Sequence, residues 1–167
     1  MEFLAWLEGT EISQWVQASD WGYPIILCLH SVGMGLVVGL ILVLNLRVLG
    51  YAKGISLSSF QSLLTVAWLG FAVNAGSGML LFMANATRLI ANWTFQLKLA
   101  LIVLGGLCIW SLWRLLKRNA DIFRGTGATT GRMKVQAVIT ILLWLGAITS
   151  GRYIAYVLDA QMKASLQ

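Results

Sequence analysis

The chain has 167 residues, of which 59% are hydrophobic and only 11% are charged. A soluble domain has about 25% charged residues, so this composition excludes an ordinary soluble protein and predicts a membrane-embedded one. The net charge of +6 does not indicate nucleic-acid binding, because the basic residues gather in the segments between apolar stretches, where they determine membrane topology.

Residues 1–20 precede the first apolar stretch and mix aromatic and aliphatic side chains with acids and amides. This pattern predicts an N-terminal amphipathic helix that lies in the interface on the outer, non-cytoplasmic face of the membrane. The dipeptide Gly9-Thr10 is expected to break it. Trp21 and Tyr23 continue an aromatic belt.

Four apolar stretches reach the roughly 20 residues that cross about 30 Å of hydrocarbon. They cover approximately residues 24–46, 60–84, 93–112 and 135–158. The predicted fold is therefore all-α, a four-transmembrane-helix bundle forming a single membrane domain over residues 1–167. Small residues such as Gly35 and Gly39, or Gly70, Asn74 and Gly78, repeat on helix faces, where they allow close helix approach or leave space for a flat ligand. So small a bundle also predicts a homo-oligomer or a subunit of a larger membrane complex.

Basic residues follow the first span and surround the connection between the third and fourth spans. By the positive-inside rule these segments face the cytoplasm and both termini face the opposite side.

His30 is the single histidine of the chain and lies inside the first span. An ionisable side chain at that position costs free energy and is a candidate functional residue. Counting 1.5 Å per helical residue places His30, Lys98 and Arg152 roughly 8–10 Å below the outer interface. Met79 falls at the same depth, and Met34 lies one turn deeper than His30 on the same face.

This set of side chains predicts a haem b site. Haem iron takes an axial histidine with a second ligand or an open position opposite, which assigns His30 as ligand and Met34 or Met79 as the candidate sixth ligand. The two propionates need cations in a medium of low dielectric constant, which assigns Lys98 and Arg152. The expected function is electron transfer near the outer face, with a redox partner on that side.

Other interpretations of the same residues remain open. His30 can hydrogen-bond a carbonyl or a serine of a neighbouring span, Asn74 can join helices, and Lys98 and Arg152 can extend to the headgroups. The chain would then be a non-catalytic structural or assembly subunit. Copper(I) suits imidazole with thioether or thiol ligands, so His30 with Met34, Met79 or Cys28 is a weaker metal alternative, which the nearby cations disfavour.

No nucleophile–base pair, paired carboxylates, phosphate loop or zinc cluster occurs in the sequence, and the apolar spans hold no acidic residue. A proton-coupled transporter usually needs such a residue. An electron-transfer or accessory protein is therefore favoured over a stand-alone enzyme.

Over nearly its whole length the chain resembles a family of small four-helix bacterial membrane proteins of unknown function. The resemblance rests on five motifs: His30-Ser31-Val32-Gly33-Met34, Leu46-Arg47-Val48-Leu49-Gly50, Gly76-Ser77-Gly78-Met79-Leu80-Leu81-Phe82, Asn92-Trp93-Thr94-Phe95-Gln96-Leu97-Lys98 and Gly151-Arg152-Tyr153-Ile154-Ala155-Tyr156. It implies a bacterial inner membrane with periplasmic termini. More distantly the chain is similar to cytochrome b561-like and copper-resistance D-like membrane proteins, in which a first-span histidine binds haem.

The third span departs from the family pattern. The chain has Cys108-Ile109-Trp110 at the place where family members often carry a further histidine. Two histidines of one chain therefore cannot hold the iron. The resemblance then implies a His/Met pair, a five-coordinate iron or a haem shared between protomers.

Overall fold

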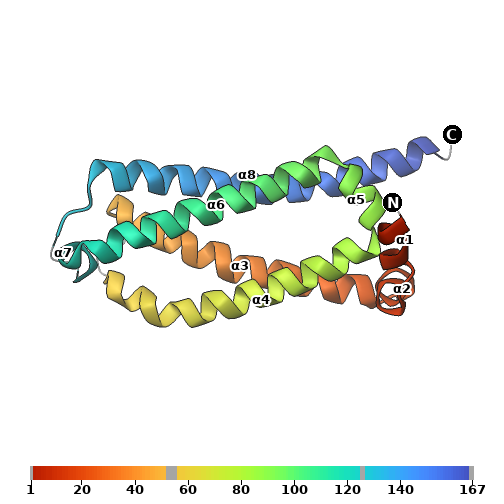
Figure 1. The fold of residues 1–167 in the computed structure, drawn as a ribbon, viewed down its shortest axis with the longest axis horizontal. Helices are drawn as coiled ribbons and strands as arrows, with labels where there is room; N and C mark the ends of the chain where they lie inside the picture. Colours follow the sequence, from red (N-terminus) through yellow and green to blue (C-terminus); the bar gives the residue numbers. More distant parts are fainter. Residues whose placement is uncertain (1, 52–55, 125–126, 166–167) are drawn as a thin grey trace. The chain divides into compact units, whose positions relative to one another are not determined.

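The computed structural model describes residues 2–51, 56–124 and 127–165, and within these ranges the protein is helical without strands. Figure 1 shows the elements in chain order: α1 (Glu2–Glu8), α2 (Glu11–Ala18), α3 (Gly22–Leu49), the 3-10 turn η1 (Leu57–Ser59), α4 (Phe60–Ala84), α5 (Ala86–Ala91), α6 (Trp93–Arg118), α7 (Ala120–Arg124) and α8 (Gly131–Ser165).

Four helices of the described chain are long and apolar enough to cross a membrane: Gly22–Leu49, Leu57–Ala84, Trp93–Arg118 and Gly131–Ile154. The predicted all-α fold with four such helices is confirmed.

The helices extend past the apolar stretches at several ends, because backbone hydrogen bonding does not stop where hydropathy falls. Helix α6 continues to Arg118, where Lys117 and Arg118 in its last turn interact favourably with the helix dipole. Helix α3 ends at Leu49, and the positive φ of 102° at the following Gly50 lets the Tyr51 N–H turn back to the Leu46 carbonyl at 3.0 Å. This is a glycine C-cap.

The chain divides into two compact units, and each is described by itself. Unit 1 comprises Met1–Leu44 and Ile55–Ala91, and unit 2 comprises Asn45–Gly54 and Asn92–Gln167. The expectation of a single membrane domain stays a prediction.

In unit 1, α3 and α4 lie side by side and touch through glycines (Figure 1). A methyl group on Gly33 would lie 2.6 Å from the Asn74 nitrogen and 2.8 Å from the Gly70 oxygen, so only a hydrogen atom fits there. Nothing lies within 4 Å of the same position on Gly35 or Gly39. The Gly70-Asn74-Gly78 repeat therefore provides close approach between helices, whereas the Gly35/Gly39 pair does not contact α4.

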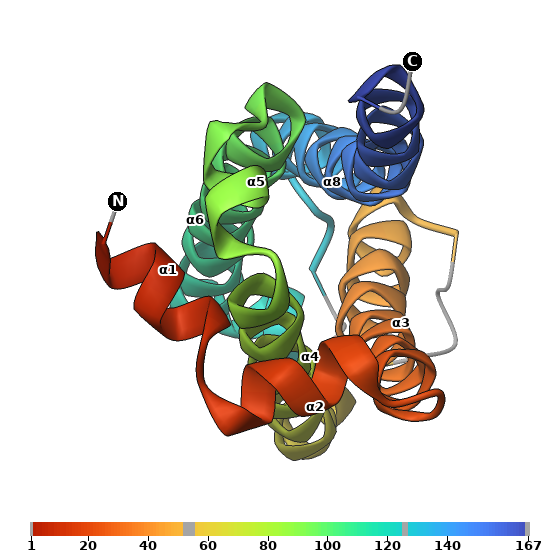
Figure 2. The same ribbon diagram turned by 90° about the vertical axis from the view of Figure 1, so that its right-hand side faces the viewer.

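The N-terminal helices α1 and α2 also belong to unit 1, and α2 lies against the α5-proximal end of α4 (Figure 2). They are separated at Gly9-Thr10, as predicted, and the Thr10 side chain caps α2. Val16 is fully buried in a cluster with Ile26 and Ala84. The Ser13 hydroxyl donates to the Met83 carbonyl at 2.9 Å, so α2 is packed on the long helices of unit 1.

A carboxylate joins α1 to α5. Both the backbone N–H and the hydroxyl of Thr87 donate to Glu8 Oε1, at 2.8 and 2.7 Å. Hydrogen bonds to a charged acceptor are stronger than neutral ones, so Glu8 is the main polar attachment of α1.

Unit 2 is built on α6 packed along α8. Gly105 of α6 lies against the Trp144 indole, 3.0 Å from its nitrogen to the position of an added methyl group. Gln136 Nε2 of α8 donates to the Cys108 carbonyl at 3.1 Å. Near the start of α8, Thr129 Oγ1 donates to the Val48 carbonyl at 2.8 Å. This hydrogen bond attaches the segment before α8 to the last turn of α3.

Candidate functional site

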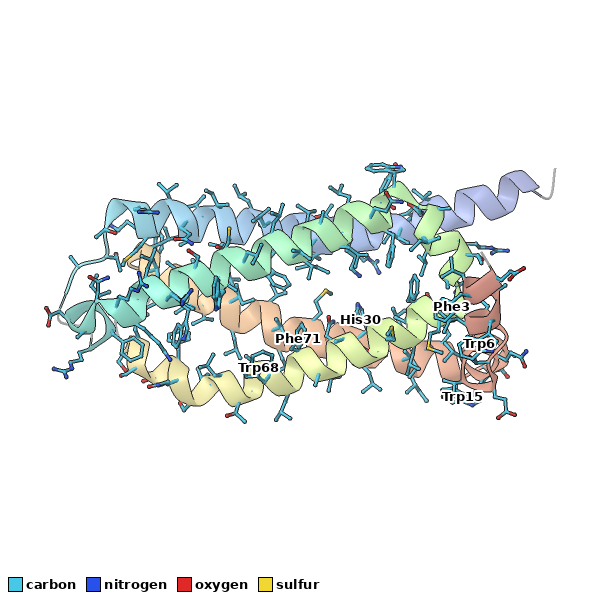
Figure 3. All side chains as sticks on the ribbon, viewed as in Figure 1. Phe3, Trp6, Trp15, His30, Trp68 and Phe71 are labelled. Carbon is cyan, nitrogen blue, oxygen red and sulfur yellow. The ribbon has the colours of Figure 1, made fainter. Side chains whose placement is uncertain are left out.

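His30 lies on the α4-facing side of α3 and joins the two helices of unit 1 through reciprocal hydrogen bonds (Figure 3). Its ring nitrogen Nδ1 is 3.0 Å from the Asn74 carbonyl. In return, Asn74 Nδ2 donates to the His30 carbonyl at 2.8 Å. Ser77 Oγ lies 3.3 Å from the same ring nitrogen. We call His30, Asn74 and Ser77 the His30 cluster.

The partners of Nδ1 determine which ring nitrogen carries the proton. A carbonyl oxygen can only accept a hydrogen bond, so the Asn74 contact requires a proton on Nδ1. The Ser77 hydroxyl donates to the Val73 carbonyl, so its oxygen also faces Nδ1 as an acceptor. Asn74 Nδ2 lies 3.4 Å from Nδ1 as well, but its shorter hydrogen bond, at 2.8 Å, is to the His30 carbonyl. In the neutral imidazole the lone pair is therefore on Nε2, the tautomer that metal-bound histidines adopt when the other nitrogen donates to a carbonyl.

Gly78 provides the surface on which the imidazole rests. A methyl group there would lie 3.1 Å from His30 Cε1 and 3.3 Å from Nδ1, closer than relaxed carbon contacts allow. The orientation of the ring therefore depends on the missing side chain at Gly78 as well as on the hydrogen bonds from Asn74.

The two candidate methionines lie differently. Met34 follows His30 by one helical turn on α3 and is partly buried. Met79 is 62% exposed and, at 100° per residue, lies about 140° around α4 from Asn74. Unit 1 thus brings Met34, but not Met79, to the side of α3 that bears His30.

The thiol of Cys28, a candidate copper ligand, also lies on a different side of α3 from His30. Cys28 is exposed and precedes His30 by two residues, which is about 200° around a helix. Within the described residues no three side chains of His, Cys, Asp or Glu gather as a metal site.

The two predicted cations belong to unit 2. Lys98 of α6 extends across Gly151 of α8, with its Cε and Nζ each 3.4 Å from a methyl group placed on that glycine. Arg152, the next residue of α8, is exposed. The predicted convergence of both cations with His30 stays a prediction.

Some polar partners were missed by sequence reasoning, and others were foreseen only as alternatives. The contact of His30 with a carbonyl of α4 and the hydrogen bond of Asn74 between the helices are both present, and both are compatible with a ligand role for His30. The Glu8–Thr87 contact has no local signal, because its partners are 79 residues apart. Nor does the sequence single out Asn92 Nδ2 and Trp144 Nε1, which are buried and have no hydrogen-bond partner among the residues that the structure describes.

Aromatic side chains are numerous on the outside of unit 1. Trp68 and Phe71 of α4 meet edge to face with ring centroids 5.8 Å apart, and both are largely exposed (Figure 3). On α1, the rings of Phe3 and Trp6 stack with their centroids 5.8 Å apart.

Comparison with known proteins finds no matching family model, no matching curated protein and no matching solved structure.

Proposed function

We propose that the protein is an integral protein of the bacterial inner membrane with four spans and with both termini on the periplasmic side. Large apolar side chains are exposed along the middle of the long helices, among them Val32, Val103 and Leu142 at 60–62%. Soluble proteins rarely expose continuous apolar surface of this kind, and hydrocarbon is the solvent that suits it. The Trp and Phe residues of α1 and α2 fit the headgroup level.

Within that membrane we propose that the protein binds haem b through His30 and transfers electrons near the periplasmic face. The observation that supports this assignment is the hydrogen bond from His30 Nδ1 to the Asn74 carbonyl. It favours the tautomer in which Nε2 is the basic nitrogen, and a hydrogen bond of this kind raises the basicity of a histidine ligand.

The residues around His30 would fit a haem held through Nε2. Asn74 and Ser77 would hold the ring against rotation, and Gly78 would leave room for its Nδ1–Cε1 edge beside α4. Met34, one helical turn from His30 on the same face of α3, would lie beside the bound group. Haem would supply a one-electron redox couple whose potential depends on axial ligation and burial.

The ligand assignment is tested by measuring haem content per chain after expression in haem-replete cells. His30→Gln is the informative variant, because the glutamine amide can still donate to the Asn74 carbonyl and preserve helix packing. We expect His30→Gln and His30→Ala to lose at least 90% of the haem. Ser31→Ala is the matched control, since that hydroxyl donates within its own helix, to the Leu27 carbonyl, and it should keep the wild-type haem content.

A second function is supported by the reciprocity of the His30–Asn74 bonds, which by itself joins two membrane helices. In this case the chain is a structural or assembly subunit of a larger complex. Wild-type protein would then be colourless, and His30→Gln would leave its association unchanged. Retention of haem by a folded His30→Gln protein would contradict the ligand assignment.

A further inference from the structure

In unit 2 a lysine side chain lies on the surface of an apolar helix pair. Lys98 begins on α6 and crosses to α8, where its Cδ, Cε and Nζ lie 3.4–3.5 Å from the position of an added methyl group on Gly151. The side chain is partly buried by this contact. Its ammonium group therefore sits against helical backbone and not in open solvent.

Among the side chains that the structure describes, none supplies a counter-ion for this ammonium group. In the part of the chain that the structure describes, no hydrogen bond or ion pair involves Lys98 or Arg152. Residues 21–120 and 122–158 contain no Asp or Glu at all. Asp159 follows Gly151 by eight residues, which is about 12 Å along a helix, and Asp121 follows the opposite end of α6.

Lys98 contacts Gly151, the residue that precedes Arg152, and a cation with no carboxylate partner among the described residues is costly in a medium of low dielectric constant. Lys98 is the sixth residue of α6, about 7.5 Å from its first residue, which is within the reach of a lysine side chain from the headgroup level. On the cytoplasmic side of membranes, basic pockets between transmembrane helices bind anionic lipid headgroups, and the same charge pairing is available to cations at the outer end.

We infer that Lys98, laid over Gly151, and Arg152 form a binding site for the phosphate group of a membrane phospholipid at the outer end of the α6–α8 pair. The inference rests on the proposed membrane placement of the chain and not on haem. It differs from the sequence expectation, in which the same two cations bind haem propionates.

The site is tested by native mass spectrometry of the detergent-solubilised chain titrated with phosphatidylglycerol. We expect a saturable adduct of one lipid per chain. Because one cation near a membrane surface contributes about 1 kcal/mol to lipid attraction, Lys98→Gln should weaken the Kd about fivefold, and Arg152→Gln should act in the same direction. Lys134→Gln is the matched control, an exposed lysine of α8 in the same unit, and its Kd should equal that of the wild type.

Separate titrations distinguish the sources of the anion. Inorganic phosphate should neither form the adduct nor displace the lipid, because the acyl chains contribute to binding. If Lys98→Gln and Lys134→Gln changed the lipid Kd equally, the inference would be overturned. The same holds if the chain bound an increasing number of lipids without saturation. An adduct with the mass of haem that Lys98→Gln removes would assign the cations to propionates. A colourless protein that still binds one lipid through Lys98 would contradict only the haem proposal.

Discussion

One asparagine holds His30 from two sides. The Asn74 backbone oxygen receives the ring N–H and the Asn74 side chain donates to the His30 backbone. Such bonds contribute about 0.6 kcal/mol on average in membrane proteins, so they orient the imidazole more than they stabilise the bundle. The close packing of α3 on α4 depends instead on glycines, since the backbones meet at Gly33 and Gly70.

This division of roles makes Gly33 the sensitive position of the helix pair. Gly33→Ala would place a methyl group 2.6 Å from a backbone nitrogen of α4, so the helices must separate, at a cost of about 1–3 kcal/mol or more. We expect a lower Tm in detergent for this variant.

Gly35→Ala is the matched control, because nothing lies within 4 Å of that position, and it should leave Tm unchanged or slightly raised. Equal destabilisation by the two substitutions would show that the α3–α4 contact is not the one described.

At the scale of elements, α1 and α2 are attached by different means. Helix α1 depends on the Glu8 carboxylate, whereas α2 buries Val16 and bonds through Ser13. Removing the carboxylate should therefore release one helix and not the other.

We expect Glu8→Ala to accelerate amide hydrogen exchange in α1 about tenfold, the effect of losing hydrogen bonds to a charged group, while exchange in α2 stays as in the wild type. Glu11→Ala serves as control, since Glu11 is exposed at the start of α2. Loss of protection in both helices after Glu8→Ala would mean that α1 and α2 dock as one piece.

The elements also show what sequence can predict here. Span positions and the break at Gly9-Thr10 follow from local composition, and both are found. Which glycines touch a neighbour does not follow, because Gly33 and Gly35 look alike until α4 is placed. For the same reason, counting residues along the helices places Met79 at the depth of His30 but does not show that Met79 lies on the exposed side of α4, away from His30.

For the whole molecule, the distribution of basic residues predicts that the chain termini and the basic segments lie on opposite sides of the membrane. In a background of Cys28→Ser and Cys108→Ser, a membrane-impermeant maleimide applied to spheroplasts should label Gln14→Cys but not Ala128→Cys. Both positions are exposed in the structure, so a difference in labelling reports the membrane side. Labelling of Ala128→Cys alone would reverse the proposed topology.

The proposed function places a haem on Nε2 of His30, a residue that hydrogen bonds join to α4. The absorption spectrum of the purified wild-type chain, recorded oxidised and after dithionite, is the test of this assignment. We expect a Soret band and a reduced α-band at up to one haem per chain. A featureless visible spectrum from a folded, haem-replete preparation would contradict it.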